Sequence, residues 1–138
     1  MKQLMSKRIV AALFAVVITC AAFINNTKDN DAEALAGMWE LESAQGRPSG
    51  FIKALGTDGK VSNILPTKNG YALSMKGTYE VTSANTYIEK IEKSFYPALN
   101  GSSNKITYKK IDDQTLELSF LVDGEEYKEK YRKLSFVQ

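Results

Sequence analysis

Tyrosine and glutamate side chains at alternating positions are the residues of this chain best suited by type and spacing to form a site. The stretch "TYIEKI" carries Tyr87, Glu89 and Ile91, and the stretch "EEYKEKYRK" carries Tyr127, Glu129 and Tyr131. Alternate side chains of an extended strand point to the same face. If these faces turn inward, they give an apolar wall with a few fixed hydroxyls and carboxylates, which is typical of a small-molecule pocket.

Three further aromatic residues lie on faces that we expect to point inward. The segment "TLELSFLV" places Leu116, Leu118 and Phe120 on one face, "GTYEVT" pairs Tyr79 with Val81, and "KITYKKI" pairs Ile106 with Tyr108. The alternative stays open that the tyrosines fill a packed core or cover the outside, with both glutamates in solvent. The predicted ligand contacts are Tyr79, Tyr87, Glu89, Tyr108, Phe120, Tyr127, Glu129 and Tyr131.

The composition excludes several kinds of catalysis. The chain has no histidine and a single cysteine, Cys20, which excludes Ser-His-Asp and Cys-His catalysis and histidine-containing metal sites. Carboxylates, lysine, tyrosine and serine remain, and their spacing selects no reaction. An isomerase or hydrolase would need an inward glutamate with a raised pKa. We therefore predict a protein that is not an enzyme and that has no cofactor and no metal.

The N-terminus has the pattern of an export signal. Basic residues Lys2, Lys7 and Arg8 precede an uncharged run of 15 residues from Ile9 to Phe23, shorter than the roughly 20 residues of a membrane-spanning helix. This order is typical of a secretory signal peptide. We predict a signal peptide at 1–22, a flexible tether at 23–34, a folded domain at 35–138, and a periplasmic or secreted location. The alternatives are an uncleaved anchor or a membrane-anchored lipoprotein lipidated at Cys20.

The charge of the chain without its leader argues against nucleic acid as a partner. Three of the 18 basic residues lie in the leader, which has no acidic residue, so 15 basic and 16 acidic residues remain, a net charge of −1. A protein so close to neutrality lacks the basic surface that nucleic-acid binding requires.

Short alternating runs separated by turn residues make up the rest of the sequence. Asp123-Gly124, between two such runs, predicts a two-residue β-hairpin, and no segment is convincingly helical. The predicted fold is all-β: an eight-stranded antiparallel up-and-down barrel, whose closure removes exposed strand edges. The alternative is an immunoglobulin-like sandwich, which often carries its tryptophan on the third strand. The strand-like segments are 38–44, 51–55, 60–65, 71–82, 86–95, 105–111, 115–122 and 125–137.

The only tryptophan, Trp39, lies in the first of these segments. Its indole could plug one end of the barrel, with Gly37 allowing the turn into the first strand. A guanidinium stacks well on an aromatic face, and the last segment, adjacent to the first in a closed barrel, supplies Arg132. We predict structural roles for Gly37, Trp39 and Arg132.

This Gly-x-Trp with a late arginine resembles the lipocalin and wider calycin signature. The runs "LAGMWELES", "GTYEV…TYIEKIEKS", "ITYKKIDDQTLELSF" and "EEYKEKYRKL" more closely resemble the lipocalin-like DUF4488 group of exported Bacteroides-type proteins, over residues 35–136. The resemblance implies a fold more than an activity.

The expected function is non-covalent binding of a small apolar ligand inside an exported, lipocalin-like barrel. The alternative is a non-enzymatic cell-envelope protein whose barrel is filled and whose outer surface binds another protein. A cavity of several hundred Å³ would favour the first, and a packed interior would favour the second. A membrane becomes a partner only if Cys20 is lipidated or the leader is uncleaved.

Overall fold

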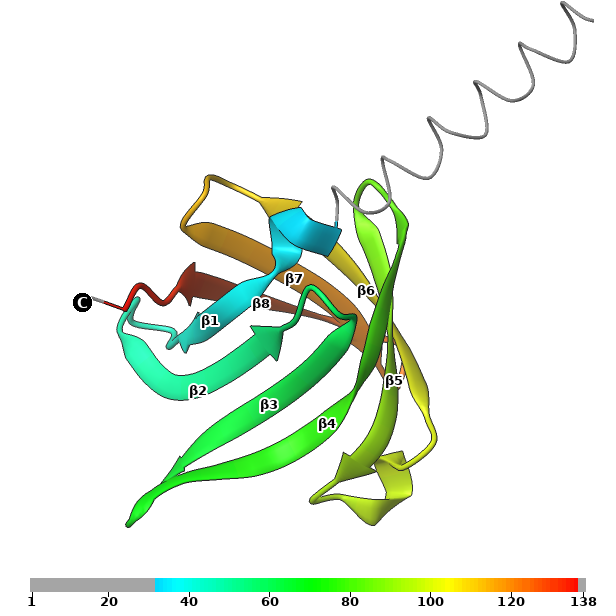
Figure 1. Cartoon of the computed structure of the whole chain (residues 1–138), viewed down its shortest axis with the longest axis horizontal. Coiled ribbons are helices and arrows are strands. Elements are labelled where there is room, and N and C mark those ends of the chain that lie inside the picture. The colour runs from blue at the N-terminus through cyan, green and yellow to red at the C-terminus, as the bar shows by residue number, and fades with distance from the viewer. Residues whose placement is uncertain (1–31, 137–138) are drawn as a thin grey trace, which may run out of the picture.

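The computed structural model describes residues 32–136 and shows a closed antiparallel barrel (Figure 1). Each strand pairs with the next along the chain, and the last pairs with the first, so the predicted up-and-down barrel is confirmed and the sandwich is excluded. The strands are β1 (Gly37–Glu42), β2 (Pro48–Leu55), β3 (Lys60–Thr67), β4 (Gly70–Ser83), β5 (Thr86–Ser94), β6 (Ser103–Lys110), β7 (Thr115–Val122) and β8 (Glu125–Lys133).

The connections follow the turn residues of the sequence. Asp123 and Gly124 have φ values of 52° and 83°, so both central residues of the β7–β8 hairpin take the positive φ that an Asp-Gly turn favours. A short 3₁₀ helix, η1 (Pro97–Leu99), joins β5 to β6. It was not predicted, because three residues are too few to show a helical period.

Residues 32–35 are helical and precede β1 (Figure 1). The predicted tether is therefore wrong for residues 32–34: the Ala36 amide donates to the Ala32 carbonyl at 3.1 Å, and the side chain of Leu35 is completely buried. Predictions for the leader, for Cys20 and for the rest of the tether lie outside the described residues. Among residues 32–136, no helix is long and apolar enough to span a membrane.

Trp39 packs at the end of the barrel where the chain enters, as predicted. It is fully buried, and its indole Nε1 donates to the Leu35 carbonyl at 2.8 Å. A buried indole N–H needs such a partner, so this bond fixes the preceding helical residues over the plug. Buried residues from β3, β4 and β7, including Val61, Val81 and Leu116, fill the same end.

The predicted stacking of Arg132 on Trp39 is wrong. Alternation along β8 turns Tyr131 inward, where it is fully buried, and therefore turns Arg132 outward, where its side chain is exposed. The strand partner of Trp39 is Lys133, whose Nζ lies 5.3 Å from the indole centroid. Gly37 has a φ of +146°, and an added Cβ there would lie 2.8 Å from Lys133 Cε. A glycine at this position thus leaves room for the lysine that covers the indole.

We expect Trp39→Ala to lower the free energy of unfolding by about 3–5 kcal/mol, because it removes a fully buried indole and leaves a cavity at the end of the barrel. In urea unfolding, Lys133→Ala should cost less in the Trp39→Ala background than in the wild type, since the contact is already lost. Arg132→Ala is the matched control and should be additive with Trp39→Ala. Coupling of Trp39 to Arg132 but not to Lys133 would contradict this arrangement.

Candidate functional site

A cavity of about 370 Å³ occupies the half of the barrel opposite Trp39. Its walls come from strands β2 to β8 and from η1, which contributes Leu99. Most of the wall is apolar and includes Phe51, Leu65, Met75, Ile91, Ile106 and Leu118. The barrel interior is therefore packed at one end and hollow at the other.

A buried ion pair lies in the cavity wall. Lys53 on β2 and Glu89 on β5 are 5% and 3% exposed, and Lys53 Nζ lies 2.6 Å from Glu89 Oε1. The Tyr87 hydroxyl donates to the same oxygen at 3.1 Å. Charges are rarely buried unless they are paired and hydrogen-bonded, and this cluster meets both conditions.

A second carboxylate in the wall comes from β8. The Tyr131 hydroxyl donates to Glu129 Oε2 at 2.6 Å, a short bond of the kind that an ionised acceptor favours. Burial raises the pKa of Tyr131, and the neighbouring Glu129 charge raises it further. Burial and Glu89 likewise raise the pKa of Tyr87. Both phenols therefore stay protonated at neutral pH and act as hydrogen-bond donors.

The structure brings four of the predicted contacts into the cavity wall: Glu89, Phe120, Glu129 and Tyr131. Tyr87 lies in the packed half of the barrel and does not line the cavity, but its hydroxyl donates to the wall residue Glu89.

The three remaining predicted contacts lie elsewhere. Tyr79 and Tyr108 flank Tyr87 in the packed half, with ring centroids 5.8 and 5.9 Å from it. The Tyr79 hydroxyl donates to the Gly56 carbonyl at 2.8 Å, in a turn at that end. Tyr127 is 48% exposed and stacks on Phe120 with centroids 6.2 Å apart. It is the direct partner of Phe120 across β7 and β8, so it lies beside this wall residue at the open end of the barrel, on the inward face but beyond the cavity wall.

Sequence reasoning missed several polar wall residues, among them Lys53 and Asn63. Both had a signal in the strand pattern: Lys53 alternates with Phe51 and Leu55, and Asn63 alternates with Val61 and Leu65. Asn63 Oδ1 is buried and has no hydrogen-bond partner within residues 32–136. Such an atom is costly to leave unpaired, and this one belongs to a residue of the cavity wall.

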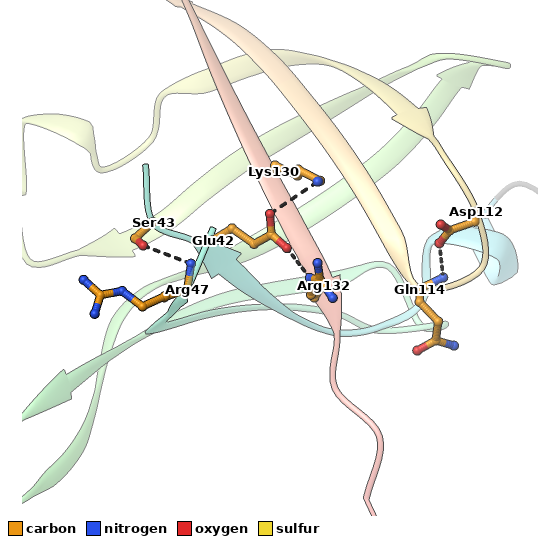
Figure 2. Close-up of polar contacts among 7 residues, drawn as sticks. All are labelled: Glu42, Ser43, Arg47, Asp112, Gln114, Lys130 and Arg132. Carbon is orange, nitrogen blue, oxygen red and sulfur yellow. Dashed lines mark hydrogen bonds and ion pairs between the residues drawn. The ribbon is translucent and has the colours of Figure 1, made fainter. Parts of the chain in front are cut away.

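A separate polar cluster lies on the outer face, at the β1–β8 seam (Figure 2). Glu42 accepts a hydrogen bond from Arg132 and lies 3.4 Å from Lys130 Nζ. The Arg132 guanidinium holds the pKa of the Glu42 carboxyl below its ordinary value. Figure 2 also shows contacts within turns: the backbone N–H of Arg47 donates to Ser43 Oγ, and the backbone N–H of Gln114 donates to Asp112 Oδ1. These bonds secure the barrel seam and its turns, and Arg132 contributes there.

Comparison with known families agrees with this architecture. Residues 34–138 match the family described as a domain of unknown function, DUF4488. The chain belongs to the DUF4488 family. The match spans β1 to β8 and therefore the whole cavity wall, which confirms the family that the sequence runs resemble. No curated protein matches the sequence.

We expect Lys53→Met to lower the free energy of unfolding by up to about 3–5 kcal/mol, because it leaves the Glu89 charge buried without its partner. The double variant Lys53→Met/Glu89→Leu should recover most of this loss. Lys60→Met is the matched control, since its ion pair with Asp58 is exposed and should be worth no more than about 1 kcal/mol. Equal effects of Lys53→Met and Lys60→Met in urea unfolding would contradict a buried pair.

Proposed function

We propose that this protein binds a small, largely apolar molecule non-covalently inside its barrel. The cavity of about 370 Å³ is the observation that carries the proposal, since small-molecule pockets usually measure about 300–1,000 Å³. A filled barrel that works only through its outer surface would not need this volume. The cavity therefore favours ligand binding over the alternative of a packed envelope protein.

The volume of the cavity limits the size of the ligand, and its walls limit the polarity of the ligand. At about 30 Å³ for each water in the liquid, 370 Å³ corresponds to roughly a dozen non-hydrogen atoms. Burial of apolar ligand surface against Met75, Ile91 and Ile106 would supply affinity at about 25 cal/mol per Å². The carboxylates and hydroxyls would then set the orientation of the bound molecule, as polar groups do in other apolar pockets.

Exposed apolar side chains gather at the open end of the barrel. The start of β4, the η1 segment and the β7–β8 hairpin all lie at this end, away from the helical residues before β1 (Figure 1). Tyr96 and Leu99 are exposed and also line the cavity. Exposed apolar patches often mark ligand-binding grooves, and here they would form the route by which an apolar molecule reaches the cavity. The residues are Tyr71, Leu73, Phe95, Tyr96, Leu99, Leu121, Val122 and Tyr127.

The remaining parts of the proposal rest on the sequence. We place the binding function in the periplasm or outside the cell because of the leader pattern at residues 1–22. We assign no catalytic role, because no arrangement of residues selects a reaction.

Ile106→Trp tests the cavity, because its added ring would enter empty space. Thr107→Trp is the matched control, since Thr107 is the next residue on β6 and lies on the outer face. We expect Ile106→Trp to leave the melting temperature unchanged or higher, whereas overpacking a filled core costs about 1–3 kcal/mol.

The readout for function is native mass spectrometry of protein purified from its own envelope without detergent. We expect a reproducible added mass on the wild type and on Thr107→Trp, and none on Ile106→Trp. An unliganded wild type, together with a destabilised Ile106→Trp, would contradict a ligand-binding cavity.

A further inference from the structure

We infer that the ligand of this cavity is a primary amine in its protonated form, carried on an apolar chain or ring of roughly ten carbon atoms. The inference rests on the proposed function and adds the chemical class of the ligand. It follows from the charge of the cavity wall, from the direction of its hydrogen bonds and from its apolar remainder.

The wall carries one uncompensated negative charge. Lys53 and Glu89 lie 2.6 Å apart and neutralise each other. Glu129 forms no ion pair with any lysine or arginine of residues 32–136 and accepts only the neutral Tyr131 hydroxyl. In a partly open cavity with mostly apolar walls such a charge is less screened than in water and attracts a cation more strongly.

Each carboxylate already accepts hydrogen bonds from the wall on one of its two oxygens. Lys53 and Tyr87 donate to Glu89 Oε1, and Tyr131 donates to Glu129 Oε2. The other carboxylate oxygens, Glu89 Oε2 and Glu129 Oε1, accept no hydrogen bond from the described part of the chain. Beside its carboxylates the cavity thus offers open acceptors, and a ligand group that binds there must bring donors.

A protonated primary amine meets both requirements. It carries one positive charge and three donors and has no acceptor. A carboxylate ligand would instead face Glu129 as a like charge, and the one lysine of the wall, Lys53, is already neutralised by Glu89. Like charges brought together in this way suppress the wrong ligand. An alcohol of the same length would keep one donor and the apolar contacts but not the charge.

The test compares three ligands of equal chain length by isothermal titration calorimetry at pH 7: decylamine, decanol and decanoate. We expect decylamine to bind at least about tenfold more tightly than decanol, the margin of one good charged hydrogen bond, and decanoate to bind most weakly. Glu129→Gln keeps the shape of the side chain and removes its charge. It should cut the decylamine affinity about tenfold and change decanol binding little.

Glu126→Gln is the matched control, because Glu126 lies on the same strand, is exposed and pairs with Lys128. It should leave all three affinities unchanged. If decanol or decanoate binds as tightly as decylamine, or if Glu129→Gln and Glu126→Gln behave alike, the amine assignment is overturned and the binding function stands. If none of the three ligands binds the wild type, the proposed function fails together with the inference.

Discussion

The pairing of β8 with β1 determines which side chains enter the barrel. This seam places Trp39 opposite Lys133 and Leu41 opposite Tyr131. Alternation along each strand then sets the direction of its other side chains, except where the register between strands shifts. Through this one constraint Tyr131 and Glu129 point inward while Arg132 and Lys130 form the outer cluster with Glu42. A register slip of one residue would exchange these two sets and would place the basic residues inside.

The closed sheet encloses an interior that is filled unevenly. Trp39, Leu35 and the tyrosines Tyr79, Tyr87 and Tyr108 pack the half where the chain enters. The other half is hollow and is bounded by apolar walls and by the Lys53–Glu89 pair. The packed half supplies the contacts that stabilise a barrel without an internal disulfide, and the hollow half is then free to accept a ligand.

Much of the fold could be predicted from the sequence because strand boundaries coincide with turn residues. The Asp123-Gly124 hairpin could be predicted from its own residues. So could the inward face of β7, which carries Leu116, Leu118 and Phe120. The error at Arg132 was avoidable, because the same alternation places Arg132 opposite to Tyr131. Lys53 was missed because lysine is almost always exposed. Its burial depends on Glu89, which is distant in sequence and becomes a neighbour only when the barrel forms.

The cavity itself could not be read from the sequence. Whether inward side chains fill a barrel depends on their combined volumes and rotamers across eight strands, and no single strand carries that information. "TYIEKI" shows the same limit, since either of its faces could point inward. In the barrel the face of Tyr87, Glu89 and Ile91 points inward, and there Lys53 compensates the Glu89 charge.

We propose above that a small molecule binds inside the hollow half of the barrel and not on its surface. The most direct test of this proposal is a titration of decylamine into protein with ¹³C-labelled isoleucine and leucine methyl groups, followed by NMR. We expect saturable shift changes at Ile91, Ile106 and Leu118, which line the cavity. Shift changes confined to the exposed Leu73 and Leu121, or none at all with decylamine and with decanol titrated in parallel, would contradict it.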